Sequence, residues 1–437
     1  MTVNTWIMKN TTMSPESYMM SLGYSAKEHQ GAVKSPIFQT STFAFRSAEE
    51  GKAFFEIAYG LREKKEGEKL GMIYSRVDNP NMHILEQRLA VWDNAEAGAF
   101  FSSGMAAITT TVFTFVRPGD LFVYASPVYG GTDHFFNHVL PQFGIKVVKF
   151  FPGDSELDIL KKIEHEAPGM KPAMIYVETP GNPVNSLIDL DMVRDMASGF
   201  STFEKDCLMV VDNTFLGPVF QHPMKFGADL VVYSATKFIG GHSDVIAGAC
   251  VGNNTLISQI KAMRTFFGSQ LDPNSSWLLM RSLETLKIRM EQQTRNAVEI
   301  AQYLKSHHMV EELHYLGNLE KGSEQERIYQ KQCEASGSMI AFNIKGGEKE
   351  AFTFLNNLEM FKLAVSLGST ESLAEHPATM THVDVAPEDR ERLGISPNLI
   401  RLSIGLEDAG DLILKIEKAF EKAEEVYSGN NKLEHSY

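Results

Sequence analysis

Short apolar runs alternate with amphipathic segments between residues 84 and 252. Runs that predict β-strands cover residues 97–103, 120–126, 145–151, 172–178, 207–212, 228–234 and 246–252. Apolar residues three and four positions apart predict helices at residues 84–94, 104–116, 131–144, 157–167 and 190–200. Because apolar strands separated by helices are typical of βαβ units, the pattern predicts an α/β fold with a mostly parallel sheet that helices cover on both faces.

A second alternating region follows a long helical pattern at residues 273–307, which we expect to join two domains. Strands are predicted at residues 338–346, 363–367 and 399–405, and helices at residues 349–358 and 408–428. The polar tail, residues 429–437, is predicted to be disordered. A chain of 437 residues is too long for one small domain. We therefore expect a large domain at residues 76–288 and a smaller α/β domain at residues 289–437.

The first 75 residues lack this alternation. Pro36 lies among serine and threonine residues in a stretch that indicates an extended chain. Residues 55–72 begin with a helix-like pattern and then become charged and are punctuated by glycine. We therefore expect residues 1–75 to form an N-terminal arm that carries an exposed, charged insertion.

The composition of the chain limits which binding partners and which cellular compartment we expect. The net charge of −14 argues against binding to nucleic acid or to an anionic membrane surface. The chain has no run of about 18 apolar residues, which a membrane-spanning helix would require, and its polar N-terminal stretch does not resemble a secretory signal. Three cysteines and the histidines show no metal-binding spacing, so we expect reduced thiols, a cytoplasmic location and no metal site.

The stretch ADLVVYSATKFIGGHSDVIAG, residues 228–248, carries a candidate nucleophile. Lys237 follows an apolar strand and a small polar turn. A lone lysine at a strand end ordinarily reaches solvent, but Gly240 and Gly241 permit a close backbone approach to a bound ligand. Partial burial lowers the pKa of a lysine and provides the neutral amine that a bond to an aldehyde requires. We therefore interpret Lys237 as the covalent anchor of a cofactor.

Two further strand ends carry matching chemistry. Asp212 ends an apolar strand, where its carboxylate could pair with a protonated ring nitrogen or simply cap a turn. Ser103, Gly104 and Met105 join a strand to a helix, so their amides and hydroxyl could bind an anion, although many helices begin with Ser-Gly. Together, the three strand ends indicate a pyridoxal 5'-phosphate (PLP) site. Glycine-rich nucleotide-binding motifs are absent from the sequence.

Eight motifs resemble, in the same order, those of the Cys/Met-metabolism PLP-dependent enzymes. They are YSRVDNP, SSGMAAI, SPVYGGT, VETPGNP, VVDNTF, SATKFIGGHSD, SLGSTESLAEHPATMTH and IRLSIGLED. This family includes cystathionine γ-synthase, cystathionine γ-lyase, methionine γ-lyase and O-acetylhomoserine sulfhydrylase. The resemblance implies the PLP-dependent transferase fold (fold type I, aspartate-aminotransferase-like), with a seven-stranded sheet in the large domain. It also implies a homotetramer of catalytic dimers whose sites are shared across the dimer interface, where the arm contacts the neighbouring subunit.

The resemblance assigns roles to individual residues. Lys237 resembles the lysine that forms the Schiff base, Asp212 the partner of the pyridinium nitrogen, and Tyr129 the tyrosine that stacks on the cofactor ring. The residues that resemble phosphate contacts are Gly104, Met105, Ser234 and Thr236, together with Tyr74 and Arg76, which would reach the phosphate of the neighbouring subunit. The residues that resemble substrate contacts are Arg401, which would hold the carboxylate, its helper Ser366, and Asn182 and Glu178. Asn182 also resembles a cofactor contact near the ring hydroxyl, with Glu178 close by.

The implied activity is γ-elimination or γ-replacement on sulfur amino acids or activated homoserine esters. Lys237 would take the Cα proton, and Tyr129 would supply a proton to the leaving group. Methionine γ-lyases typically have cysteine where Gly131 stands, and O-acetylhomoserine sulfhydrylases usually carry Gly-His-Gly-Thr where this chain has residues 241–244. We therefore expect an activity of the cystathionine γ-synthase or γ-lyase type, with those two enzymes as alternatives. The effect of Ser369, which stands where glycine or an acid is common, is left open.

Two other classes of protein remain alternatives. A fold-type-I aminotransferase would use the same lysine and aspartate, but it would exchange amino groups with keto acids and would not release a thiol or 2-oxobutyrate. A catalytically silent protein of the same fold would lack the cofactor absorption band that borohydride removes. Product analysis, which distinguishes amino-group exchange from release of a thiol or 2-oxobutyrate, separates the aminotransferase from a γ-lyase or γ-synthase. The borohydride test of the absorption band separates the catalytically silent protein.

Overall fold

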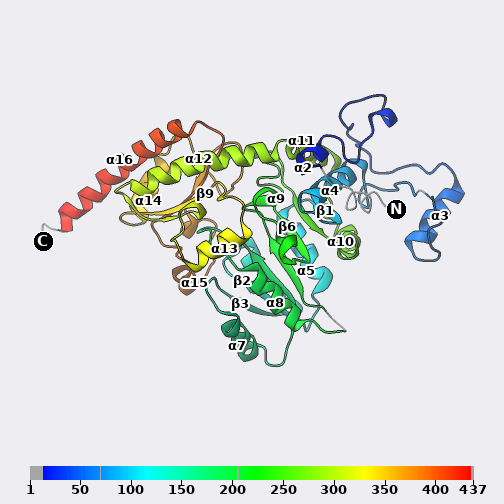
Figure 1. The fold of residues 1–437 in the computed structure, drawn as a ribbon, viewed down its shortest axis with the longest axis horizontal. Helices are drawn as coiled ribbons and strands as arrows, with labels where there is room; N and C mark the ends of the chain where they lie inside the picture. Colours follow the sequence, from blue (N-terminus) through cyan, green and yellow to red (C-terminus); the bar gives the residue numbers. More distant parts are fainter. Residues whose placement is uncertain (1–12, 69, 204–205, 435–437) are drawn as a thin grey trace.

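Two β-sheets organise the chain, one in each of its halves. The structure, a computed structural model, describes residues 13–68, 70–203 and 206–434. Figure 1 shows the long helix α12 (Leu286–Ser306) running from the region of the larger sheet to that of the smaller one. We propose the boundary between the two domains near residue 288, as predicted from the sequence, because the chain passes from one sheet to the other along this helix.

The larger sheet has seven strands in the spatial order β1-β7-β6-β5-β4-β2-β3. They are β1 (Ala97–Phe101), β2 (Leu121–Ala125), β3 (Lys146–Phe150), β4 (Pro172–Glu178), β5 (Leu208–Asp212), β6 (Leu230–Tyr233) and β7 (Gly248–Gly252). Neighbouring strands are parallel except where β7 pairs with β1 and β6. This arrangement confirms the predicted mostly parallel sheet.

Alternate residues of each strand supply two separate apolar cores, one on each face of the sheet. The helices that cover the sheet include α4 (Pro80–Trp92), α5 (Gly104–Phe115), α7 (Glu156–Glu166), α8 (Leu190–Phe200), α10 (Asn254–Phe267) and α11 (Pro273–Leu283). Val231 and Tyr233 of β6 pack in the core with α4, α7, α8 and α11. Leu230 and Val232 pack in the other core with α5 and α10. The apolar runs predicted as strands are therefore apolar throughout because both faces are covered.

The smaller sheet has five strands in the order β10-β11-β12-β9-β8. They are β8 (Val310–His314), β9 (Met339–Ile344), β10 (Lys362–Leu363), β11 (Leu373–Glu375) and β12 (Leu399–Ser403). The helices of this half are α12, α13 (Glu324–Gln332), α14 (Glu348–Asn356), α15 (Pro387–Arg392) and α16 (Ala409–Glu434). Apolar side chains of α12, α14 and α16 form one core with this sheet, as a smaller α/β domain requires.

Several predicted elements differ from the observed ones. The helical pattern at residues 273–307 is two helices, α11 and α12, and at the break the Thr285 amide and Oγ1 both donate to the Ser282 carbonyl. The strand predicted at residues 363–367 pairs only at Lys362–Leu363, and the chain then leaves the sheet to bring Ser366 to the site described below. The tail predicted to be disordered continues α16 as far as Glu434, and residues 435–437 lie outside the described residues.

Three further segments depart from the predicted pattern. The helix predicted at residues 131–144 divides into α6 (Gly130–His134), a π-helical turn at Phe135–Val139 and a 3₁₀ turn at Leu140–Phe143. Pro141 contributes to this division because it has no amide proton for a helical hydrogen bond. Helices α10 and α13 and strands β8 and β11 are among the elements that were not predicted. Within the described residues, no helix is both long and apolar enough to cross a membrane.

The N-terminal arm is anchored at its middle and projects at its insertion. Asn81 of α4 accepts a hydrogen bond from the Phe38 amide and donates one to the Pro36 carbonyl. A β-bridge between Thr42 and Tyr74 closes the base of the insertion. Figure 1 shows α3 (Ala48–Ala58), which leads into the insertion at residues 55–72, standing away from both sheets. The insertion therefore projects from the point that carries Tyr74.

Candidate active site

The carboxyl ends of four strands of the larger sheet surround one cavity of about 240 Å³. Asp212 is the last residue of β5, Glu178 is the last residue of β4, and Lys237 follows β6. The residues that line the cavity are Ser103, Gly104, Met105, Ile108, Tyr129, Thr132, Glu178, Asn182, Asp212, Thr214, Phe215, Ser234, Thr236, Lys237, Ile246 and Leu367. The structure thus brings together most of the predicted site residues at the edge of a parallel sheet where ligands bind.

The side chain of Lys237 is held inside the protein. Its Nζ donates a hydrogen bond to Ser366 Oγ at 2.9 Å. Burial lowers the pKa of Lys237 to about 8, and the charge of Arg401 acts in the same direction while Glu375 opposes it. A substantial fraction of the amine is therefore neutral near pH 8, as covalent attachment and proton transfer both require.

This pKa has a direct kinetic consequence. We expect cofactor-free protein to take up PLP at a rate that rises with pH and levels off above about pH 8, because only the neutral amine attacks an aldehyde. The measurement is the rise of the absorbance of the covalently bound cofactor, with Lys237→Ala as the blank. A rate that keeps rising toward pH 10.5 would show an ordinary, solvent-exposed lysine.

Two buried carboxyl groups lie side by side opposite this lysine. Glu178 and Asp212 face each other in the β4–β5 register. Asp212 accepts hydrogen bonds from the Thr214 amide at 3.0 Å and from the Tyr176 hydroxyl at 3.0 Å. Burial raises the pKa of both carboxyl groups, and the charge of Asp212 adds to the effect on Glu178. Such a pair is stabilised by a nearby cation, and a protonated ring nitrogen would supply one.

The N-terminus of α5 offers an anion site beside Ser234. A Cβ atom added to Gly104 would lie 3.0 Å from the Ser234 Cβ, so the glycine keeps this space open. The first amides of a helix have no partner within it, and Gly104 and Met105, the first two residues of α5, line the cavity. Ser103 Oγ accepts a hydrogen bond from the Ala106 amide and caps the helix. Backbone amides and the Ser234 hydroxyl could therefore hold a phosphate.

The hydroxyl of Thr236, which the family resemblance assigns as a phosphate contact, already forms two hydrogen bonds to the backbone. It donates to the Ala247 carbonyl at 3.2 Å and accepts from the Ala247 amide at 2.9 Å. The side chain thus stabilises the turn that carries Lys237, and only one lone pair of its oxygen remains free. A phosphate contact from this hydroxyl would require the bond to the Ala247 carbonyl to break.

Arg401 of β12 reaches the site from the smaller sheet. Its Nη2 donates to the Ser366 carbonyl at 2.9 Å, and its Nη1 donates to Asn182 Oδ1 at 2.8 Å. The same Nη1 lies 2.8 Å from Glu375 Oε1, and both side chains are almost fully buried. The sequence did not reveal Glu375 as a site residue, because its partner is opposite it on a neighbouring strand and 26 positions away.

Tyr129 covers one wall of the cavity and keeps 46% of its surface exposed. Its amide donates to Glu178 Oε2 at 2.8 Å, which fixes the backbone from which the ring extends. A Cβ atom added to Gly131 would lie 2.7 Å from the Tyr129 ring, so a cysteine there would displace the ring. Ser369, whose effect the sequence left open, does not line the cavity. Its Oγ is hydrogen-bonded to Ser243 Oγ at 2.7 Å.

Four predicted site residues do not line this cavity. Ser366 and Arg401 are hydrogen-bonded to the lining residues Lys237 and Asn182, whereas Tyr74 and Arg76 lie apart from the cavity. They lie together on an exposed stretch, with the guanidinium carbon of Arg76 5.5 Å from the centre of the Tyr74 ring. Arg76 donates to the Thr265 carbonyl at the end of α10. Neither residue lines the cavity that Lys237 occupies in the same chain.

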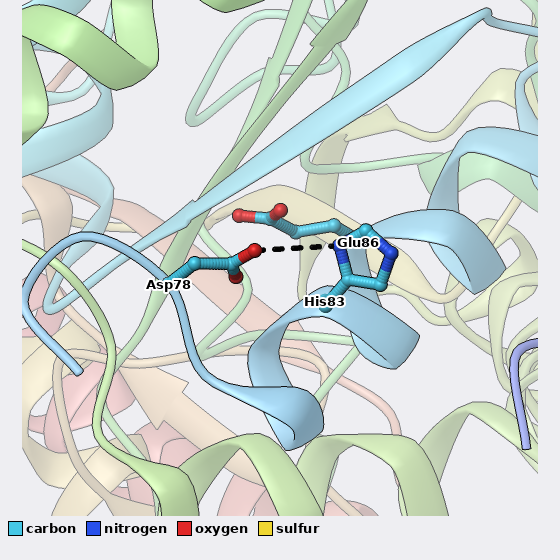
Figure 2. Close-up of side chains that lie close together, drawn as sticks. All are labelled: Asp78, His83 and Glu86. Atoms are coloured by element: carbon cyan, nitrogen blue, oxygen red, sulfur yellow. Dashed lines mark ion pairs between the residues drawn. The ribbon is translucent and has the colours of Figure 1, made fainter. Parts of the chain in front are cut away.

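Asp78, His83 and Glu86 form a separate cluster, shown in Figure 2. His83 Nδ1 lies 3.6 Å from Asp78 Oδ2. The carboxylate of Glu86 already pairs with Arg264 and Lys261. Burial alone would raise the pKa of Glu86, but the positive charges of Lys261 and Arg264 outweigh it and keep this pKa below its usual value. The negative charge of Glu86 is thus already matched, and we assign no metal ion to the cluster.

The chain matches known proteins over nearly its whole length. A family profile described as "Cys/Met metabolism PLP-dependent enzyme" covers residues 16–421. L-methionine gamma-lyase from Pseudomonas putida is 39% identical over 401 residues, 91% of this chain and 94% of that protein. Cystathionine gamma-lyase from Bacillus subtilis is 38% identical over 410 residues, 94% of this chain and 100% of that protein.

A solved structure shows the same similarity. It is cystathionine gamma synthase from Xanthomonas oryzae pv. oryzae in complex with aminoacrylate and cysteine. It aligns with a TM-score of 0.83 at 33% sequence identity, and the alignment covers 95% of this chain and 99% of that one. The similarity therefore includes both sheets and the site between them.

Proposed function

The chain belongs to the Cys/Met-metabolism PLP-dependent enzymes, and we propose that within this family it cleaves cystathionine by γ-elimination. The matches confirm the predicted family, the PLP-transferase fold, the cofactor, and PLP-dependent γ-elimination or γ-replacement as the class of reaction. The individual site residues and the preferred substrate are our proposals, and they are supported by the geometry described above.

One observation carries the proposed roles. Ser366 accepts a hydrogen bond from Lys237 through its hydroxyl and another from Arg401 through its carbonyl. One residue therefore sets the distance between the proposed base and the proposed carboxylate clamp. A substrate whose carboxylate binds Arg401 would hold its Cα–H bond next to the Lys237 amine, and such orientation alone can contribute several kcal/mol.

The proposed roles of the other residues follow from their positions in the site. PLP, when bound, supplies an electron sink for the charge that develops at Cα. Asp212 holds a proton at the ring nitrogen, because its buried carboxylate needs a cationic partner. Lys237 would accept the Cα proton. A second proton would then leave Cβ, and the electron pair released there would expel the sulfur from Cγ, to which the Tyr129 hydroxyl would donate a proton.

Glu375 supports cystathionine over methionine as the substrate. Its Oε1 pairs with Arg401, while its buried Oε2 has no hydrogen-bond partner among the described residues. A substrate carboxylate on Arg401 would compete with Glu375, and the released carboxylate would then accept an ammonium group. Cystathionine carries a second ammonium group, whereas methionine ends in an uncharged thioether.

Methionine γ-lyase remains the second candidate, because several relatives with 38–41% identity carry that name. Purified holoenzyme should release 2-oxobutyrate from L-cystathionine with a higher kcat/KM than from L-methionine. The assay should also contain O-succinyl- and O-acetyl-L-homoserine, each with and without cysteine or sulfide. Faster release of methanethiol from methionine would replace our proposal with the second candidate, and faster γ-replacement on an ester would favour a synthase.

We also propose that the enzyme is a homotetramer of catalytic dimers in which Tyr74 and Arg76 complete the site of the partner subunit. Both side chains are away from the cavity of their own chain and next to the projecting insertion. The three cysteines are free thiols, which supports our proposal of a cytoplasmic location.

Subunit mixing tests the shared site. We expect Lys237→Ala and Arg76→Ala to be nearly inactive alone and to regain activity when they are mixed and allowed to exchange subunits. A hybrid dimer would contain one site with both native residues, so random exchange should restore about one quarter of the wild-type sites. Mixtures that stay inactive although hybrids form, as mass spectrometry would show, would place Arg76 in the site of its own subunit.

A further inference from the structure

A second cavity, of about 220 Å³, lies between the N-terminal arm and helix α11. Its lining includes Tyr24 and Lys34 of the arm, Arg88 of α4, and Trp277 and Arg281 of α11. Figure 1 shows α2 (Pro15–Met19) and α11 next to α4, and both helices contact it. None of the residues that line this cavity also lines the cavity around Lys237.

The cavity is positively charged in a chain whose net charge is −14. Lys34, Arg88 and Arg281 contribute three cations, and Glu284 is the one acidic residue in the lining. Lys34 Nζ lies 2.6 Å from both carboxylate oxygens of Glu284, so this lysine already matches the acid. Arg281 is exposed and forms no ion pair within the part of the chain that the structure describes. The two arginines therefore leave a local excess of positive charge.

Arg88 is buried, and only part of its hydrogen-bonding capacity is used. Its side chain is only 5% exposed, and its Nε donates to the Leu22 carbonyl at 3.2 Å. Its Nη1 lies 3.7 Å from Glu284 Oε1, which is beyond hydrogen-bond distance. In the described ranges, the two Nη atoms of Arg88 make no hydrogen bond. A guanidinium buried in this way gains from an anion that accepts two parallel hydrogen bonds.

The remaining walls are apolar. Met20, Val33 and Met280 line the cavity together with the Trp277 ring. Trp277 Nε1 already donates to the Ser35 carbonyl at 2.9 Å, so the ring offers the cavity only its apolar surface. The volume is below the range of pockets that hold drug-sized ligands. The ligand should therefore be small, with one anionic end and a short hydrocarbon part.

We propose that this cavity binds a short-chain organic carboxylate. The carboxylate group pairs with Arg88 and Arg281, and the hydrocarbon chain packs against Trp277 and Met280. The site is separate from the catalytic cavity, and the inference does not depend on the proposed preference for cystathionine.

Titration of the holoenzyme with sodium butyrate tests the proposal. Trp277 lines the cavity, so binding should change the intrinsic fluorescence, and Trp277→Phe should remove this change. We expect Arg281→Ala, at an exposed position, to weaken binding about tenfold or more because it removes a charged partner. Arg295→Ala on α12 is the matched control, since it removes an exposed arginine outside the cavity, and it should bind butyrate as the wild type does.

Three results would overturn the proposal. The first is no saturable fluorescence change with butyrate. The second is equal affinity in Arg281→Ala and in the wild type. The third is binding of inorganic phosphate as tight as that of butyrate at constant ionic strength, because it would mean that the apolar walls contribute nothing.

Discussion

Replacing Lys237 with alanine is expected to lower turnover by about 10³-fold or more, because the variant loses both the covalent anchor and the proposed base. The amine is buried, hydrogen-bonded to Ser366, and has a pKa of about 8, so no solvent-exposed lysine can take its place. Turnover on cystathionine and the absorbance of the bound cofactor are the two measurements. Borohydride reduction followed by mass spectrometry should attach PLP to the wild type and not to the variant.

A matched control separates this effect from a general loss of positive charge. Lys225→Ala removes an exposed lysine that pairs with Glu334 on the surface, and its activity should equal that of the wild type. Turnover of Lys237→Ala within tenfold of the wild type would remove the proposed role of this amine. If Lys237→Ala lost activity but still carried covalently bound cofactor, another lysine would have to be the anchor.

The larger sheet could be predicted from the sequence because its signals are local. Strands that are apolar on both faces and helices with apolar residues three and four positions apart identified each βα unit. The strand ends then placed Asp212 and Lys237 together, since the carboxyl ends of parallel strands meet at one edge. The antiparallel pairing of β7 was not predictable, because direction within a sheet depends on how the chain returns and not on strand composition.

The parts of the site that could not be predicted depend on contacts between the two sheets. Glu375 meets Arg401 only because β11 and β12 are neighbours, and the segment around Ser366 leaves the sheet so that one residue contacts both Lys237 and Arg401. Such contacts join residues far apart in sequence and have no periodic signature. The resemblance to a known family supplied the roles of Arg401 and Ser366 and left Glu375 unassigned.

Arg401→Ala is expected to raise KM for cystathionine on the order of 100-fold, because it removes a charged partner of the substrate carboxylate. It should also destabilise the protein by about 3 kcal/mol, since Glu375 would be left as a buried, unpaired carboxylate. The two effects can be separated. Adding Glu375→Gln to Arg401→Ala should recover most of the stability, because it removes the unpaired charge, but it should not recover the KM.

Steady-state kinetics and urea denaturation provide the measurements, and Arg264→Ala is the structural control. Arg264 is buried away from the Lys237 cavity, where it pairs with Glu86 at 2.7 Å and donates to the Phe100 carbonyl, so its loss should cost stability with little change in KM, although Glu86 keeps Lys261 as a partner. If the double variant regains both stability and substrate affinity, Arg401 acts only as the counter-ion of Glu375. The carboxylate clamp would then have to be sought elsewhere, because a residue that binds substrate directly cannot be replaced by removing its intramolecular partner.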